Sequence, residues 1–488
     1  MPGCARLRLS VFPVISDAPG PMSSKFSPKQ LRLNRGLRPG KRLFKSNVTF
    51  LRKDFIVKTV VRKIITSPAN DSGYVDFFYQ YYPDGDFQHR IERHEVQGES
   101  DFFNKAFKRE SFDNGKTWGK WQDVYKDAFQ LIPGGEQINH PVHMRTYNPK
   151  YDHVVSTRME RIFLKDHHDA YDKYWNGIPD TFFDHSFLDV RSNNGQLIST
   201  QMLRYEDGPE SGGLLDMAYC RKNGSYSLSN VVVCANGDIL FPMSTSVRKC
   251  CEIAQVDLAE YSQSCPDLAV GVMIVRGSWN EKKQTYDLVF SKPIIVSDLI
   301  SSRGLGEPAV MELANGRIIV VMRGSNTCYK PWNTRIAPGT PGYKFFSCSD
   351  DGGKTFSPPM PWYFDNREVL YSSASISYLF RSLKNNRCYW VGNITDPVRT
   401  DGNFLRWPLC IVEVDECSGI LKKDTLTVID TRQEGESDLL QLSNFFMLHD
   451  RETLHTELYL AKIGQYEDSS NRNVFKGDCC KYLIDWEA

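Results

Sequence analysis

The stretch Ser111-Phe112-Asp113-Asn114-Gly115-Lys116-Thr117-Trp118 returns in similar form over residues 349–356, as SDDGGKTF. Both copies fit one template, Ser-x-Asp-x-Gly-x-Thr-aromatic. An Asp at the third place can accept hydrogen bonds from backbone N–H groups that follow it, and the Gly tolerates a positive φ. The Thr hydroxyl can add a further bond, and the ring can pack onto the next layer. We therefore expect two copies of one tight turn, and with them a repeated structural unit.

The two octapeptides resemble the Asp-box of the sialidase-like β-propellers. In that family the motif forms the turn between the third and fourth strands of a blade, on the rim opposite the active site. The resemblance implies first of all an all-β fold, a six-bladed β-propeller. Asp-boxes also occur in propellers that are not sialidases, so the motif alone does not imply a reaction.

Four hairpin turns support a repeated blade. Asn236-Gly237 and Asn315-Gly316 each stand between two apolar runs, and Asn-Gly favours a type I′ hairpin because both turn residues need a positive φ. Weaker turns of this kind occur at Asn148-Pro149 and Asn385-Asn386. The turns are therefore 70 to 88 residues apart. Such a period suits four short strands with their loops, and the chain after residue 45 has room for about six such blades.

Composition limits the partners and the compartment. The 488 residues carry a formal net charge of +1, which does not suggest a polyanion such as nucleic acid as a partner. The 13 cysteines show no zinc-binding spacing, so we expect free, mostly buried thiols and favour the cytoplasm. No apolar run approaches about 18 residues, so no membrane span is predicted. We expect a monomer without metal or cofactor.

The chain divides into a tail and one domain. Residues 1–45 hold a short apolar run that Pro13 interrupts, which is a poor signal-peptide core, followed by a basic stretch. We predict a disordered tail over residues 1–45 and the propeller over residues 46–488. Within the propeller, residues 165–184 lack β alternation and predict a short helix or an inserted loop. Residues 454–460 are expected to pair with residues 54–61, which would close the ring and remove its sheet edges.

Glu307 and Arg323 are the main candidates for chemistry. They flank the hairpin at Asn315-Gly316, so both return to one rim of the propeller. A carboxylate beside a guanidinium suits the binding of an acidic sugar, although a structural ion pair is an equal alternative. The resemblance implies that Glu307 activates a tyrosine nucleophile and that Arg323 is one of three arginines that bind the substrate carboxylate. Arg406, just before a Pro-Leu strand, resembles a second of the three.

The sequence departs from the sialidase pattern at two points. No Arg-Ile-Pro segment that would supply the first arginine of the three is present, and residues 442–448, where the nucleophile is expected, contain no tyrosine. Tyr371 is the nearest alternative nucleophile. Retaining sialidases use a tyrosine because an anionic nucleophile would repel the anionic substrate.

A second constellation predicts a different reaction. His140, His143, Arg145 and Tyr147 lie close together, and in an extended strand His143 and Arg145 share a face. Such a group could neutralise a uronic acid and remove its α-proton, as in propeller polysaccharide lyases, which this chain is similar to in architecture only. The leading prediction is an exo-acting glycoside hydrolase that removes a terminal acidic sugar, such as sialic acid, from glycans. The alternatives are a lyase on uronic-acid glycans and a non-catalytic glycan-binding propeller.

Overall fold

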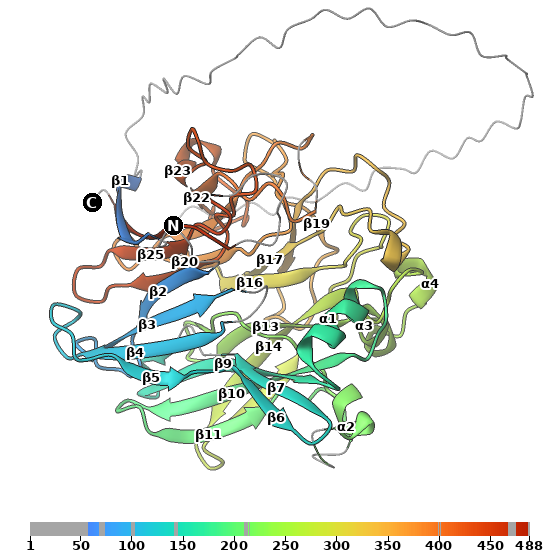
Figure 1. Cartoon of the computed structure of the whole chain (residues 1–488), viewed down its shortest axis with the longest axis horizontal. Coiled ribbons are helices and arrows are strands. Elements are labelled where there is room, and N and C mark those ends of the chain that lie inside the picture. The colour runs from blue at the N-terminus through green and yellow to red at the C-terminus, as the bar shows by residue number, and fades with distance from the viewer. Residues whose placement is uncertain are drawn as a thin grey trace, which may run out of the picture. The chain divides into compact units, whose positions relative to one another are not determined.

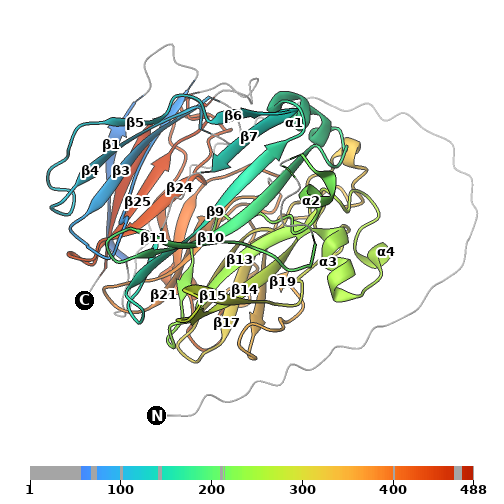
Figure 2. The ribbon, with the colours of Figure 1, turned by 90° about the horizontal axis from the view of Figure 1, so that it is seen from below.

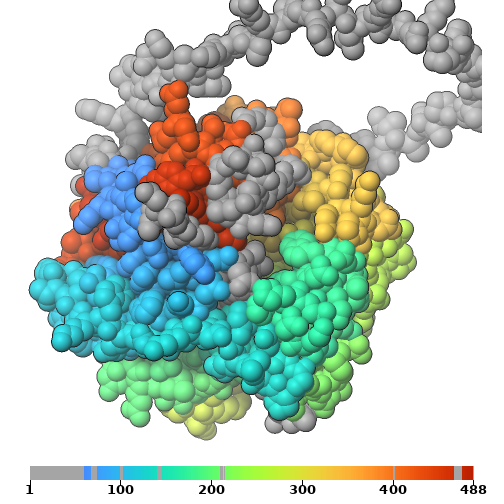
Figure 3. Space-filling model, viewed as in Figure 1, coloured from blue at the N-terminus to red at the C-terminus, as the bar shows by residue number. Residues whose placement is uncertain are grey.

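Strands dominate the computed structural model, which describes residues 57–67, 74–98, 103–140, 145–208, 213, 215–398, 400, 402–466 and 475–486. All of them belong to one unit, Phe55–Ala488. The predicted tail, residues 1–45, lies outside the described residues. The strands form six antiparallel sheets in a ring (Figures 1 and 2), which confirms the prediction of an all-β, six-bladed propeller. In Figure 3 the chain passes around this ring from blue to red.

Four-stranded sheets make up five of the six described blades. The first sheet contains β2 (Val75–Tyr81), β3 (Arg90–Gln97), β4 (Lys105–Ser111) and β5 (Gln122–Tyr125). The third contains β12 (Val232–Val233), β13 (Ile239–Ser246), β14 (Val270–Asn280) and β15 (Thr285–Phe290). The fourth contains β16 (Gly306–Glu312), β17 (Ile318–Arg323), β18 (Lys344–Ser349) and β19 (Met360–Pro361). The fifth contains β20 (Tyr378–Arg381), β21 (Cys388–Asn393), β22 (Leu409–Glu413) and β23 (Thr427–Asp430).

The second blade is larger, because an extra hairpin extends it. It contains β6 (Phe129–Ile132), β7 (Gly135–His140), β8 (Thr146–Asn148), β9 (His153–Phe163), β10 (Phe182–Ser192) and β11 (Leu197–Met202). The predicted insertion at residues 165–184 contains α1 (His167–Trp175), which Asp166 caps by accepting a hydrogen bond from the Asp169 N–H. The other helices are short: α2 (Met217–Arg221), α3 (Val247–Ala254), α4 (Leu258–Tyr261), and the 3₁₀ turns η1 (Lys330–Trp332) and η2 (Lys423–Thr425).

The last blade closes the ring with strands from both ends of the described chain. It contains β24 (Phe445–His449), β25 (Thr456–Ala461), β26 (Cys479–Trp486) and β1 (Val57–Thr66). The predicted direct pairing of residues 454–460 with residues 54–61 is wrong, because β26 lies between β25 and β1 and pairs with both. The closure itself is confirmed, and apolar side chains of neighbouring blades pack at each interface. Leu409 and Leu458, for example, are fully buried in one cluster.

The two octapeptide turns have the same internal hydrogen bonds. The Gly115 N–H donates to Ser111 Oγ (2.8 Å), and the Thr117 hydroxyl donates to Asp113 Oδ2 (2.6 Å). In the second copy, Gly353 N–H and the Thr355 hydroxyl make the equivalent bonds to Ser349 and Asp351 (2.9 and 2.6 Å). Each turn joins the third strand of its blade to the fourth. These bonds stabilise the carboxylate, those from Thr117 most, and lower the pKa of Asp113 to about 2.

Candidate functional site

The fourth blade brings three charged residues to one end of its strands. Arg323 at the end of β17 pairs with Gly306 of β16 on one side and with Lys344 of β18 on the other. At the opposite end of the same ladder, Ile318 pairs with Ser349, where the second octapeptide turn begins. The five residue steps between these ends correspond to about 17 Å. The charged cluster and the turn therefore occupy opposite rims of the blade.

Glu307 stands on an irregular piece of backbone. Its φ is 41°, in the left-handed region, and the β16–β17 register shifts between Gly306 and Ala309. Such a bulge re-aims a side chain, and strained backbone of this kind gathers at functional sites. The Arg323 guanidinium donates to Glu307 Oε1 over 2.7 Å, as the hairpin predicted. The other carboxylate oxygen, Oε2, is buried and has no hydrogen-bond partner among the described residues.

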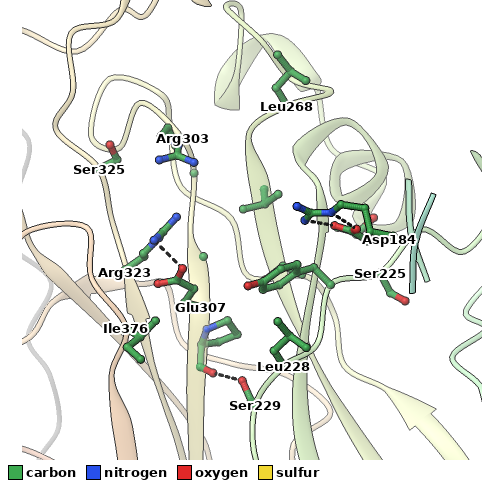
Figure 4. A pocket seen from close by; sticks show the side chains of 18 of the residues that line it. Asp184, Ser225, Leu228, Ser229, Leu268, Arg303, Glu307, Arg323, Ser325 and Ile376 are labelled. Atoms are coloured by element: carbon green, nitrogen blue, oxygen red, sulfur yellow. Dashed lines mark hydrogen bonds and ion pairs between the residues drawn. The ribbon is translucent and has the colours of Figure 1, made fainter. Parts of the chain in front are cut away.

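A cavity of about 1010 Å³ opens beside this pair. Figure 4 shows Arg303, Arg323 and Glu307 along one wall, with Asp184 and Ser225 across from them. The Asp184 carboxylate is already paired, because Arg161 donates to both of its oxygens (2.6 and 2.8 Å). The polar and aromatic lining also includes Tyr174, Trp175, Tyr226, Asn230, Ser377, Tyr378, Asn403 and Arg406.

Arg303 is a cavity residue that the sequence interpretation missed. Its guanidinium lies over the rings of Trp175 (5.4 Å) and Trp332 (5.7 Å), and within the described chain no carboxylate pairs with it. The next residue, Gly304, has a φ of 70°, and a Cβ there would come within 2.0 Å of the Val270 carbonyl oxygen. The turn that presents Arg303 therefore requires glycine. The Arg-Gly pair just before Glu307 was the only signal in the sequence, and it is a weak one.

Arg406 also reaches the cavity, held by neutral groups of the protein. Its Nε donates to the Asn403 carbonyl (2.9 Å), its Nη1 to Gln441 Oε1 (2.8 Å) and its Nη2 to the Ala374 carbonyl (2.9 Å). These three acceptors are neutral groups, and they hold the guanidinium in place. Arg406 thus contributes positive potential to the cavity.

Lys344 lies fully buried behind these residues and connects them electrostatically. Its ammonium donates to the carbonyl of Ser375 and to the Ser375 hydroxyl (3.2 Å). Burial lowers its pKa to about 7; Glu307 opposes this shift, whereas Arg323 and Arg406 add to it. Lys344 therefore lies within electrostatic reach of Glu307, Arg323 and Arg406.

Tyr371 is not among the described residues that line the cavity. Its ring packs against that of Tyr343, with centroids 5.7 Å apart, and the two residues form an isolated bridge. Tyr226 and Tyr378 do line the cavity. Burial raises the pKa of the Tyr378 phenol, so this hydroxyl stays protonated at neutral pH.

The second predicted constellation, His140, His143, Arg145 and Tyr147, does not line the cavity with any of its described residues. His143 falls outside the described residues, and of His140 only the backbone, at the end of β7, is described. Arg145 Nη1 donates to the Pro83 carbonyl (2.8 Å), and the Tyr147 hydroxyl donates to Asp152 (2.7 Å). Tyr147 also lies under Arg451 (5.6 Å).

These contacts place Arg145 and Tyr147 on the rim of the octapeptide turns. The neighbour of Arg451, Asp450, accepts a hydrogen bond from Asn114 of the first turn. Neither Arg145 nor Tyr147 belongs to the described lining of the cavity. The structure therefore brings Glu307, Arg323 and Arg406 together and does not bring Arg145 and Tyr147 to them.

Over the described part of the chain, no cluster of three or more His, Cys, Asp or Glu residues has the arrangement of a metal site. Of the helices in the ranges given above, none has the length and apolar character to cross a membrane. The described cysteines are all free thiols, and Cys250, Cys388 and Cys480 are examples of the buried ones.

Comparison with known proteins concerns the fold. No family model and no curated protein matches the sequence. Among solved structures, a protein of unknown function from Dyadobacter fermentans is similar with a TM-score of 0.51 at 14% identity, over 87% of this chain and 99% of its own. The NanB sialidase from Streptococcus pneumoniae has a TM-score of 0.48 at 11% identity, over 87% and 70% of the two chains. A Trypanosoma rangeli sialidase has a TM-score of 0.45 at 12% identity, over 87% of this chain and 59% of its own.

Proposed function

We propose that the protein is an exo-acting glycoside hydrolase of the sialidase type, which removes a terminal acidic sugar from a glycan. One observation carries the proposal: Glu307, which pairs with Arg323, lines one cavity together with Arg323, Arg303 and Arg406, and that cavity is large enough for a sugar. Guanidinium groups bind carboxylates through paired, charge-assisted hydrogen bonds. Three guanidinium groups in the lining of one cavity favour an anionic ligand.

Arg303 offers an answer to the missing first arginine. The sequence lacks the Arg-Ile-Pro segment expected on the first blade, and Arg303 brings a third guanidinium to the cavity from the segment between the third and fourth blades instead. Two indole rings hold its side chain in place, so its N–H edge is ready for a ligand oxygen. In this proposal Arg303 and Arg323 bind the sugar carboxylate, and Arg406 supports them with its charge.

Glu307 takes the role of the catalytic carboxylate or of the base that activates a nucleophile. Tyr226 and Tyr378 replace Tyr371 as the favoured nucleophiles, because they line the cavity. A neutral phenol is the suitable nucleophile here, since the cavity is built to hold an anion. Across the cavity, the Asp184 carboxylate is held by Arg161.

Three assays test the proposal: sialoside hydrolysis, elimination on a uronic-acid glycan, and binding to a glycan array. A hydrolase of this type releases free sialic acid from a fluorogenic sialoside. A lyase instead produces an unsaturated uronate with its own absorbance, which would support the His143, Arg145 and Tyr147 constellation. A binding protein gives neither product and retains glycans on an array. Absence of sialoside hydrolysis together with either of the other results contradicts the proposal.

A further inference from the structure

Arg303 differs from Arg323 and Arg406 in how its guanidinium is held. Arg323 donates to a carboxylate, and Arg406 donates to neutral oxygens of the protein. Among the described residues, no group accepts a hydrogen bond from the Arg303 guanidinium, which lies over the rings of Trp175 (5.4 Å) and Trp332 (5.7 Å). Aromatic faces attract a guanidinium without using its N–H groups. The hydrogen-bond donors of Arg303 are therefore not used within the described chain.

A second cluster of the same kind shows what Arg303 lacks. In the first blade, the Arg109 guanidinium lies over the rings of Trp118 (5.2 Å) and Trp121 (4.6 Å). It also donates to the Glu92 carboxylate. Arg303 has two indole contacts as well, but no carboxylate of the described chain pairs with it. A ligand carboxylate would complete at Arg303 the arrangement that Glu92 completes at Arg109.

The two rings beside Arg303 come from separate segments that meet at the cavity. Trp175 ends α1, which is inserted in the second blade, and Trp332 lies in η1, between β17 and β18 of the fourth blade. The Trp332 indole N–H donates to the Tyr174 carbonyl (3.1 Å), and the two indoles stack with centroids 6.2 Å apart. A Cβ at Gly177 would come within 2.5 Å of the Pro331 carbonyl oxygen. This close contact fixes the position of both rings.

Exposure distinguishes the two tryptophans. Trp332 is 1% exposed and packs in the interior, whereas Trp175 is 37% exposed. Trp175 and Arg303 both line the cavity, and Figure 4 shows the Arg303 side chain near that of Arg323. Loss of the Trp175 ring should therefore affect the guanidinium more than the stability of the fold.

We propose that Trp175 is a positioning residue, which holds the Arg303 guanidinium in the orientation that receives the carboxylate of the sugar. This inference rests on the proposed function and deepens it. An arginine side chain has many rotamers, and fixing one of them in advance removes a cost that binding would otherwise carry. Trp175 thus contributes to the affinity for the sugar acid through Arg303.

A double-mutant cycle on the full chain tests the coupling between the two side chains. The probe is N-acetylneuraminic acid, and saturation-transfer NMR, which is suited to weak ligands, measures its dissociation constant. We expect Trp175→Leu to weaken binding about 3- to 10-fold and Arg303→Met to weaken it about 10- to 100-fold. In the Arg303→Met chain, Trp175→Leu should add less than about twofold, because the group that it positions is gone.

Two further variants keep the test specific. Trp175→Phe retains an aromatic face and should bind the sugar acid within about twofold of the unaltered chain. Trp121→Leu is the matched control, because Trp121 is 39% exposed and lies under Arg109, and it should leave binding unchanged. Thermal unfolding of each variant checks the fold, and Trp175→Met replaces a Trp175→Leu chain that does not fold.

The outcomes separate this inference from the proposed function. If Trp175→Leu has no effect, or an equal effect with and without Arg303, the inference is overturned even where sialosides are hydrolysed. If Arg303→Met abolishes binding, Trp175→Phe decides, and a loss equal to that of Trp175→Leu overturns the inference. If the two side chains are coupled but no sialoside is hydrolysed, the inference stands and the hydrolase proposal falls. If the unaltered chain binds no sugar acid, both fall.

Discussion

The two ends of the fourth blade differ in their backbone conformation and in how their polar groups are paired. At one end, in the turn over residues 349–356, Ser349, Asp351 and Thr355 are hydrogen-bonded to one another. At the other end, Glu307 sits on left-handed backbone, and among the described residues no carboxylate contacts the buried Lys344 and Glu307 Oε2 has no hydrogen-bond partner. The strands between them are the same. The difference shows that the blade gains stability at the turn and keeps strain and unpaired charge at the cavity, where a ligand can use them.

Removal of Arg323 tests the cavity end most severely. Arg323→Ala leaves the Glu307 carboxylate without its 2.7 Å partner and removes a donor to the substrate. We expect kcat/KM for a fluorogenic sialoside to fall about 1000-fold, in the range seen when one preorganised charge contact is lost. Arg317→Ala is the control, since Arg317 pairs with Asp350 at the turn end of the same strand. Equal losses for the two variants would erase the distinction between the ends.

Titration of Lys344 should make the affinity of the cavity for a sugar acid depend on pH. Its pKa is lowered to about 7 by burial, so below pH 7 its charge adds to that of Arg323 and Arg406, and above pH 7 it is lost. Binding of a sugar acid should therefore weaken about 3- to 10-fold from pH 6 to pH 8, and Lys344→Met should flatten this profile. Calorimetry at both pH values checks it, and an unchanged profile in the variant would show that another group titrates.

The same lysine makes a prediction about stability. An unfolded lysine keeps its proton to about pH 10.4, so between pH 7 and that value the unfolded chain binds the proton that the folded chain has released. The free energy of unfolding should then rise with pH across this window, and less so in Lys344→Met. Denaturant titrations at pH 7 and pH 9 measure the difference. A steeper rise in the variant than in the unaltered chain would contradict the assignment.

Substitutions in the octapeptide turns should lower the stability of the protein and leave sialoside hydrolysis unchanged. Asp351→Asn weakens bonds to the Thr355 N–H and hydroxyl, so we expect Tm to fall by a few degrees.

The low pKa of Asp113 has a related consequence, because the stability that its carboxylate contributes is present above about pH 4 and is lost as the pH falls toward 2. Calorimetric scans at pH 3 and pH 7 compare Asp113→Asn with the unaltered chain. A large loss of sialoside hydrolysis in either variant would be unexpected.

The smallest effect concerns Tyr147. Its hydroxyl donates to Asp152 on the turn rim, away from the described cavity. Tyr147→Phe should therefore change sialoside hydrolysis less than about twofold, as is usual for a surface substitution. Initial rates at saturating and limiting substrate measure this. A loss comparable to that of Arg323→Ala would return the His143, Arg145 and Tyr147 constellation to the mechanism.

Sequence reasoning succeeded where the physics is local. The octapeptide turns and the Asn-Gly hairpins are specified by their own residues, so the blade and the positions of Glu307 and Arg323 followed from them. Arg303 was missed because its support comes from Trp175 and Trp332, which are distant in sequence. Lys344 was missed because nothing in the run KFFSCS shows that its first residue is buried. Tyr371 was chosen as the nearest alternative in the sequence, but tertiary packing places its ring against that of Tyr343.

The central claim is that Glu307 is part of a machinery that hydrolyses sialosides. The most direct measurement is the release of sialic acid by Glu307→Gln beside Glu312→Gln, which alters the other end of β16, where Glu312 accepts the Ala235 N–H (2.9 Å). The account predicts that the unaltered chain and Glu312→Gln hydrolyse the sialoside at similar rates, and that Glu307→Gln loses at least about 100-fold in kcat. Undiminished turnover by Glu307→Gln would contradict it.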